Sequence, residues 1–258
     1  MINKLDELYE KFFKENFIDN KSGIVKDTNT NRDMRFATKI AIGDNYSSSQ
    51  IKLLFISLDM GEDEYFKENR FQNYEERKTN ALNEDLNKNP HMAGVYGTAL
   101  FFLKNQNKWE DEWQKYSQSN KFFKEAIKDN IDILPKNVLS YISLINFYSF
   151  VTVGRGCEMD ERGQKIGKKE ERTGGSDRIF INRQSEINLL VEIINTVKPN
   201  VIVVQSQTLR KCFRDEIKPK INYDLDIYIG YHPSVFGRGI KYRNPNIYME
   251  SLLKGKLI

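Results

Sequence analysis

Short apolar runs alternate with longer polar or amphipathic segments along the chain, and this alternation predicts strands separated by helices. Residues 51–58 (IKLLFISL) are almost continuously apolar, which is typical of a strand covered on both faces. Residues 200–204 (NVIVV) and 225–229 (LDIYI) have the same character, as does the first half of residues 138–153. Strands separated by helical segments favour parallel pairing. We therefore expect an α/β fold, a three-layer α/β/α sandwich with a central, mainly parallel four-stranded sheet.

Apolar residues at three- and four-residue spacing indicate the helices. Residues 5–17 and 183–197 each carry such a stripe, and residues 209–218 indicate a further helix. Residues 90–96 are interpreted as a loop that precedes a helix starting at residue 97. The two stripes consist of Leu5, Leu8, Phe12 and Phe13 in the first helix, and of Ile187, Leu190, Val191 and Ile194 in the second.

No internal repeat and no Pro-rich linker divides the sequence, so we expect one domain over residues 1–258. Residues 1–50 are expected to form an N-terminal helical extension. Residues 154–176 are rich in glycine and in charges of both signs and have no apolar periodicity. Long segments of this kind are usually functional or disordered, and we interpret this one as a flexible insertion.

The composition excludes several classes of protein. Two cysteines, Cys157 and Cys212, cannot build a disulfide framework or a four-cysteine metal site within the chain. No stretch approaches the roughly 20 apolar residues that a membrane-spanning helix needs, and the charged N-terminus is unlike a secretory signal. We therefore expect a cytoplasmic protein without a metal or cofactor, and we expect a monomer.

The formal net charge is +4, which permits nucleic-acid binding without establishing it. Residues 236–258 contain five Lys or Arg residues and one acidic residue, so the formal excess of positive charge could lie in this stretch.

Polar clusters follow two of the predicted strands, at residues 59–62 and 230–234. In open parallel sheets, ligands bind beyond the carboxyl ends of the strands, so both clusters are expected to face one crevice.

Four features, in order along the chain, resemble the uracil-DNA glycosylase superfamily. They are the acidic turn after residue 58, an Asn within residues 144–147 (LINF), an IN-R-x-x-E helix start running into KPxVIVV, and residues 231–234 (YHPS) after the last strand. The resemblance covers residues 51–239 and implies a protein that flips a base out of DNA and excises it.

The resemblance assigns catalytic roles to Asp59 and His232. A carboxylate at Asp59 can stabilise an oxocarbenium-like sugar and orient the hydrolytic water. The alternative is that Asp59 caps the next helix together with Glu62. His232 falls where the family places a histidine that donates a hydrogen bond to the departing pyrimidine. The alternative is a loop histidine made rigid by Pro233.

Recognition of the base is assigned to Asn146, Gly61 and Phe66. The amide of Asn146 can bond to the edge of a flipped pyrimidine, or it can be a satisfied residue at a strand end. Gly61 stands where the uracil-strict branch has a blocking tyrosine, so the pocket could admit a larger pyrimidine. Stacking on the base is assigned to Tyr65, Phe66 or Phe71, any of which could instead belong to the core.

Contacts to DNA are assigned to Ser234, Phe236 and Arg238. Phe236 stands where the family inserts an apolar wedge into the base stack, and Arg238 would bind an adjacent phosphate. The alternative is that Phe236 packs into the core and Arg238 is solvated.

The sequence thus predicts a monofunctional DNA glycosylase that excises uracil or a C5-modified pyrimidine from duplex or single-stranded DNA. Ser57 and Met60 depart from the family's catalytic turn, which keeps open the alternative of a catalytically silent member that binds nucleic acid or protein. An unrelated hydrolase or nucleotide-binding enzyme is disfavoured, because G-x-S-x-G, GxxxxGK[ST] and GxGxxG are all absent from the sequence.

Overall fold

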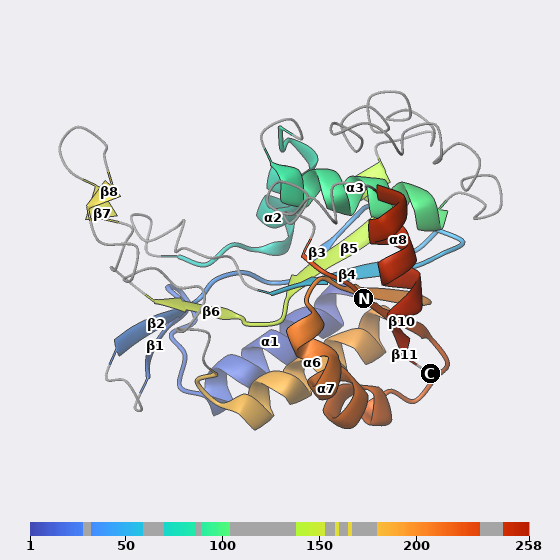
Figure 1. The fold of residues 1–258 in the computed structure, drawn as a ribbon. Helices are drawn as coiled ribbons and strands as arrows, with labels where there is room; N and C mark the ends of the chain where they lie inside the picture. Colours follow the sequence, from blue (N-terminus) through green and yellow to red (C-terminus); the bar gives the residue numbers. More distant parts are fainter. Residues whose placement is uncertain are drawn as a thin grey trace. The chain divides into compact units, whose positions relative to one another are not determined.

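Helices and strands are arranged as an α/β protein in the computed structural model (Figure 1). It describes residues 1–27, 32–58, 70–85, 89–103, 138–152, 158–159, 165–166, 180–232 and 245–257. The chain divides into two compact units. Unit 1 comprises residues 1–39, 58–74 and 146–197, and unit 2 comprises residues 40–57, 75–145 and 198–258. The single domain over residues 1–258 that the sequence predicts stays a prediction.

The sheet of unit 2 has six strands among the described residues, where the sequence predicts four. They are Ala41–Ile42 (β3), Leu53–Ser57 (β4), Ile142–Asn146 (β5), Val201–Val204 (β9), Asp226–Ile229 (β10) and Lys256–Leu257 (β11). Their order is β11-β10-β9-β4-β5-β3. The central strand β9 pairs in parallel with β4 and β10, whereas the outer strands β3 and β11 pair antiparallel with β5 and β10. The sheet is therefore mixed and mostly parallel, and the four predicted strands form its middle.

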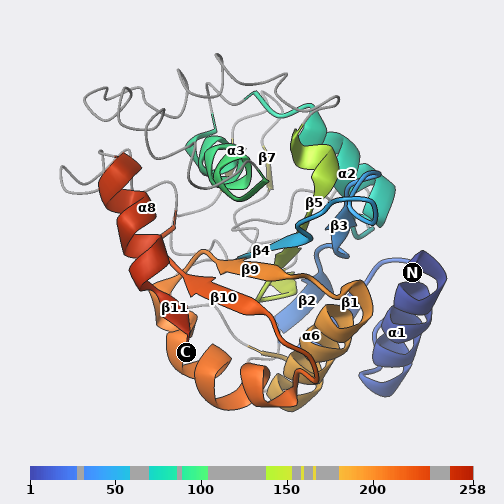
Figure 2. The same cartoon turned by 90° about the vertical axis from the view of Figure 1, so that its right-hand side faces the viewer.

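Helices lie on both sides of this sheet. Figure 2 shows α3 (Pro90–Leu103) and α8 (Pro245–Lys254) on one side. Four short helical segments, orange in that view, lie on the other side: η3 (Gln207–Leu209), α7 (Arg210–Cys212), η4 (Phe213–Ile217) and η5 (Lys218–Lys220). Every residue of β4, β5 and β9 is buried, which explains why these strands are almost continuously apolar in the sequence.

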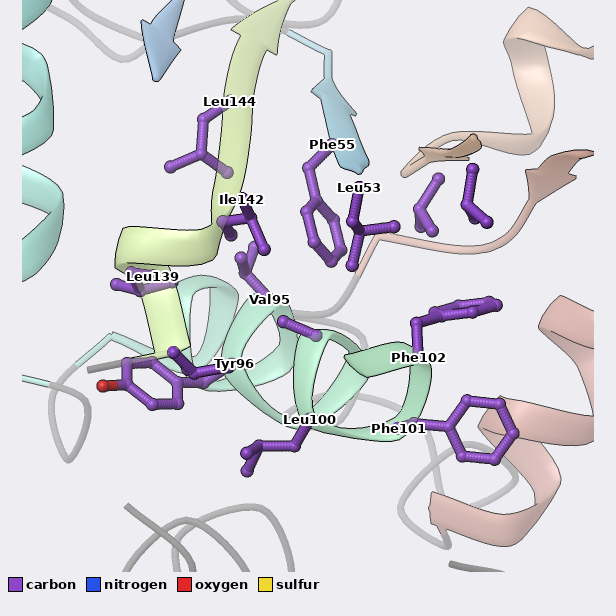
Figure 3. Packing of buried hydrophobic residues seen from close by; sticks show 14 of the residues in the cluster. Leu53, Phe55, Val95, Tyr96, Leu100, Phe101, Phe102, Leu139, Ile142 and Leu144 are labelled. Atoms are coloured by element: carbon purple, nitrogen blue, oxygen red, sulfur yellow. The ribbon is translucent and has the colours of Figure 1, made fainter. Parts of the chain in front are cut away.

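The main core of unit 2 fills the space between the sheet and α3 with α8. Figure 3 shows Leu53 and Phe55 of β4 facing Val95 and Phe102 of α3. Buried residues of α8 and of the helical turn η1 (Val138–Tyr141) join the same cluster, among them Tyr248, Met249, Leu252, Val138 and Leu139. This packing fixes where α3 begins relative to the carboxyl ends of the strands.

Unit 1 contains the second large sheet, which has three antiparallel strands in the order β1-β2-β6. Their bounds are Ile24–Asp27 for β1, Arg32–Phe36 for β2 and Phe150–Thr152 for β6. Two helices of this unit, α1 (Ile2–Glu15) and α6 (Arg183–Val197), contact each other, and Asn16 Nδ2 donates to Ser185 Oγ at 3.0 Å.

A cluster of aromatic rings holds unit 1 together. Phe36 of β2 packs edge-on against Phe13 of α1 at 5.0 Å and against Phe150 of β6 at 5.6 Å between ring centroids. Lys39 closes the cluster at one side, because its ammonium binds Asp6 at 2.7 Å and lies 4.9 Å from the centre of the Tyr74 ring. Edge-to-face rings and a cation over a ring add to the free energy gained by burial.

Several expectations are corrected by the structure. Within residues 1–50, the described part forms one helix and three strands, so the N-terminal extension is not simply helical. Residues 90–96, expected as a loop, are the first turns of α3. The run at residues 138–153 is divided between η1, β5 and β6, and β5 and β6 belong to different sheets. Most of the insertion at residues 154–176 lies outside the described residues. Within the insertion, Glu158–Met159 (β7) and Lys165–Ile166 (β8) pair antiparallel.

Candidate functional site

Two polar side chains end neighbouring parallel strands in unit 2. Ser57 is the last residue of β4, and Gln205 directly follows β9. The backbone N–H of Gln205 donates to the carbonyl oxygen of Ile56 at 2.9 Å, so the backbone hydrogen bonding between β4 and β9 includes the first residue after β9. Both side chains are buried, with exposed fractions of 5% for Ser57 and 1% for Gln205. They lie at the carboxyl edge, where sheets of this type bind ligands.

His91 reaches this edge from the start of α3. Asn89 precedes the helix, and its Oδ1 accepts hydrogen bonds from the backbone N–H groups of His91 at 3.1 Å and of Met92 at 3.2 Å. This is an N-cap, and Pro90 suits the first helical position because it has no N–H group to satisfy. The cap therefore places His91 in the first turn of α3.

The amide oxygen of Gln205 joins these side chains. Ser57 Oγ donates to Gln205 Oε1 at 2.9 Å, and His91 Nε2 lies 2.8 Å from the same oxygen and 3.3 Å from Ser57 Oγ. Because an amide oxygen only accepts, the network assigns the proton to Nε2 of His91. In the neutral ring, Nδ1 is then an acceptor.

The environment of His91 favours its neutral form. Burial lowers the pKa of His91 below its usual value, and this effect outweighs the opposing hydrogen bond to Gln205. The charge of Arg77 also lowers this pKa, whereas that of Glu84 raises it. His91 is therefore an uncharged hydrogen-bond donor near neutral pH.

His232 comes to the same edge from the end of β10, and its ring stacks on that of His91. The ring centroids are 4.7 Å apart and the planes meet at 17°. Behind the ring, Tyr248 Oη donates to the carbonyl oxygen of Tyr231 at 3.2 Å. Gly230 lies so close to α8 that an added Cβ would come within 2.7 Å of Leu252 Cδ1. The short connection after β10 is thus held against α8.

One buried donor of this arrangement takes no part in its hydrogen bonds. Gln205 Nε2 is buried and has no hydrogen-bond partner among the described residues. Leaving a buried donor unpaired costs about 1–3 kcal/mol. Ser57, Gln205, His91 and His232, which we call the histidine-pair site, combine this donor with two flat imidazole rings.

The sequence predictions fare unevenly at this site. His232 lies at the carboxyl edge of the sheet, because it follows the end of β10 by three residues. Asn146 is the last residue of β5 and is 6% exposed, but it belongs to unit 1, so its predicted convergence with His232 stays a prediction. Phe71 packs on Phe13 at 5.3 Å between ring centroids, which places this candidate for base stacking in the aromatic cluster of unit 1. The other candidates lie outside the described residues: Asp59, Gly61, Tyr65, Phe66, Ser234, Phe236 and Arg238.

Three residues of the histidine-pair site were not predicted: Ser57, His91 and Gln205. The sequence contained one usable signal for His91, because Asn89-Pro90 is a helix-start pattern that should have placed His91 in a first helical turn. The chain also has only two histidines. The contact between them is long-range and leaves no local pattern.

The C-terminal basic stretch is partly neutralised within the fold. Lys256 Nζ binds Asp226 Oδ1 at 2.7 Å, and Lys254 Nζ lies 3.5 Å from Glu250 Oε2. Arg238, Lys241 and Arg243 lie outside the described residues. Any excess positive charge of this stretch therefore rests on those three.

Within the described ranges, no group of three or more His, Cys, Asp or Glu side chains could hold a metal ion. No helix in the described part of the chain is both long enough and apolar enough to span a membrane. A scan against protein-family models finds no match for this chain, and a search of curated proteins finds none either.

Proposed function

We propose that this chain is a DNA glycosylase that flips uracil or a C5-modified pyrimidine out of DNA and hydrolyses its N-glycosidic bond. The observation that carries the proposal is the position of His232, which follows β10 at the carboxyl edge of the parallel strands, beside buried hydrogen-bonding groups. The resemblance to the uracil-DNA glycosylase superfamily assigns a histidine at this point of the fold to the departing base. The three-layer α/β/α arrangement of that superfamily is part of the proposal.

The proposed chemistry uses residues of this chain alone. As the glycosidic bond breaks, positive charge develops on the sugar and negative charge on the base. Asp59, two residues beyond Ser57, would orient water and stabilise the sugar cation. His232 would donate a hydrogen bond to a carbonyl oxygen of the base as that oxygen becomes negative. No cofactor or metal takes part in this scheme.

Binding and recognition complete the proposal. Asn146 would bond to the edge of the flipped base, Phe66 would stack on it, and Gly61 would leave room at C5. Ser234, Phe236 and Arg238 would contact the DNA around the flipped nucleotide. We propose that the protein acts as a monomer in the cytoplasm.

Base release from synthetic oligonucleotides tests the proposal. Duplex and single-stranded DNA carrying uracil, mismatched thymine or 5-hydroxymethylcytosine is incubated with the protein, and abasic sites are detected by alkaline cleavage. Asp59→Asn should reduce release by a factor of 100 or more while DNA affinity is kept or increased, since a negative charge near phosphates is removed. Arg214→Ala changes an exposed residue paired with Asp215 and serves as the matched control.

Three outcomes are informative. Base release that is lost in Asp59→Asn and kept in Arg214→Ala supports the proposal. Unchanged base release in Asp59→Asn would favour the alternative that Asp59 only caps a helix, because Asn caps a helix as well as Asp does. DNA binding without release from any substrate would favour the catalytically silent alternative.

A further inference from the structure

The two histidines of the chain, far apart in sequence, form a single stacked pair. The ring centroids of His91 and His232 are 4.7 Å apart, and the ring planes are nearly parallel at 17°. Offset-stacked rings at this separation are a favourable arrangement for aromatic side chains. The pair thus gives His232 a flat neighbour that limits how far its ring can turn.

His91 is itself held at two points. Its backbone is fixed by the Asn89 cap, and its ring is fixed by the 2.8 Å contact between Nε2 and Gln205 Oε1. Ser57 Oγ donates to the same Gln205 oxygen and so holds the amide in place. A ring restrained in this way can serve as a fixed surface for a second ring.

Charge on the two rings is coupled by their separation. Two imidazolium rings in contact repel each other, and at about 5 Å this repulsion shifts a pKa by about one pH unit or more. Among the described residues, the groups that act on His91 are Arg77 and Glu84 by their charges, Gln205 and Ser57 by hydrogen bonds, and His232 by stacking. Burial already disfavours a charged His91, and a charge on His232 would disfavour it further.

We propose that His91 is the positioning residue of His232, holding its imidazole in one orientation through the stack. The pairing stands on the geometry of the histidine-pair site, whereas its part in excision rests on the proposed function. His91 touches neither base nor sugar in this scheme. It acts on the reaction through the ring of His232.

The pairing is tested without DNA. Protein labelled with ¹⁵N in histidine gives only two sets of imidazole signals, so both rings can be titrated by NMR. The pKa of His91 should be higher in His232→Phe than in the wild type by about one pH unit, because the phenyl ring keeps the stack and removes the competing charge. An identical pKa of His91 in the two proteins would overturn the inference.

The positioning role is tested by base release in two variants of His91. His91→Ala removes the stacking surface and should lower kcat about tenfold or more with KM for DNA unchanged. His91→Phe restores a flat ring and should recover most of that loss, a rescue that a merely structural contribution to folding would not give. Equal loss of kcat in both variants would contradict positioning by stacking.

The two tests separate the inference from the proposed function. If the wild-type protein releases no base, the proposed function fails. The NMR titration then still decides whether the two histidines are coupled.

Discussion

The amide of Gln205 controls the proton on the neighbouring imidazole. Its oxygen accepts from Ser57 and from His91, so both contacts require an acceptor, while its nitrogen is a buried donor without a partner in the described part of the chain. A carboxylate in the same place would keep both contacts and add a negative charge. The residue that sets the protonation state of His91 can therefore be changed with almost no change of shape.

Gln205→Glu should raise the pKa of His91, because a carboxylate less than 3 Å from Nε2 stabilises the imidazolium form. The same histidine NMR titration measures the shift. Gln205→Met has a similar volume and removes the acceptor, so it should lower the pKa of His91, since the bond to Gln205 raises this pKa in the wild type. Shifts in the same direction in both variants would show that the amide does not act through this bond.

At the scale of elements, α6 begins with a reciprocal cap built from the IN-R-x-x-E motif. Asn182 Oδ1 accepts from the backbone N–H of Ser185 at 3.1 Å, and Glu186 Oε1 accepts from the backbone N–H of Asn182 at 3.0 Å. Glu186 is only 4% exposed, and burial raises its pKa to about 8. The motif thus has a clear structural role in starting the helix, and it contributes a buried acid with a raised pKa.

The raised pKa of Glu186 predicts a pH-dependent stability. The folded state holds this proton more tightly than the unfolded state, so the free energy of unfolding should fall as pH rises from about 4.5 to about 8 and then level off. Glu186→Gln keeps an acceptor for the cap and cannot ionise, so it should flatten this decline. Urea unfolding between pH 5 and pH 8.5 measures it. Glu192→Gln changes an exposed residue of the same helix, so its free energy of unfolding should fall with pH as in the wild type. If the free energy of unfolding of Glu186→Gln falls just as much, the Glu186 carboxyl is not the source of the pH dependence.

The first helix ends in a strained way. Phe17 has a positive φ of 55° and is 91% exposed, while Ile18 N–H donates to Phe13 O and Phe17 N–H donates to Lys14 O. This is the Schellman pattern, in which the residue at the left-handed position is usually glycine. A phenylalanine there carries steric strain and buries no apolar surface in return.

Phe17→Gly should stabilise the protein by about 0.5–1 kcal/mol, because relief of the left-handed strain exceeds the entropy that glycine adds to the unfolded chain. Thermal and urea unfolding measure this gain. Phe17→Ala keeps the strained conformation and should give no such increase. A gain of equal size in both variants would point to the exposed ring rather than to the backbone.

The strands in the middle of the sheet could be predicted because burial on both faces makes β4 and β9 continuous or nearly continuous apolar runs, and β10 is apolar after Asp226. The outer strands β3 and β11 have two residues each, too few for any pattern, and β2 has the mixed sequence RDMRF. His232 could be placed because the end of β10 determines where it lies. His91 could not, since its contacts with Gln205 and His232 join three separate segments and depend on tertiary packing.

For the whole molecule, the distribution of charge matters more than its total of +4. Lys256 is paired with Asp226, and its Nζ also lies 5.6 Å from the centre of the Tyr228 ring. Its positive charge therefore contacts β10 at the edge of the sheet. A Lys or Arg that neutralises a phosphate releases counterions condensed on the DNA, and a cation already paired within the fold is less available for that contact. On this argument, Lys256 is a poor candidate for DNA contact, and Arg238 stays the residue that the resemblance assigns to a phosphate.

Removing one phosphate contact should lower the slope of log K against log salt concentration by about one. Arg238→Ala should show this change with every DNA sequence, whereas Lys256→Ala should leave the slope as in the wild type. Fluorescence anisotropy with a labelled duplex across a salt series measures both slopes. If the slope changes equally in the two variants, Lys256 also contacts DNA despite its pairing with Asp226.

Support for the His232 connection comes from residues that are synthesised after it. Tyr248 holds the carbonyl of Tyr231, Gly255 O accepts from the backbone N–H of Ile229, and Leu252 packs on Gly230. Translation runs from the N-terminus, so a nascent chain can fold β4, α3 and β9 before these residues leave the ribosome. A messenger cut short within codons 245–257 would yield a polypeptide that contains His232 without the groups that hold it in place.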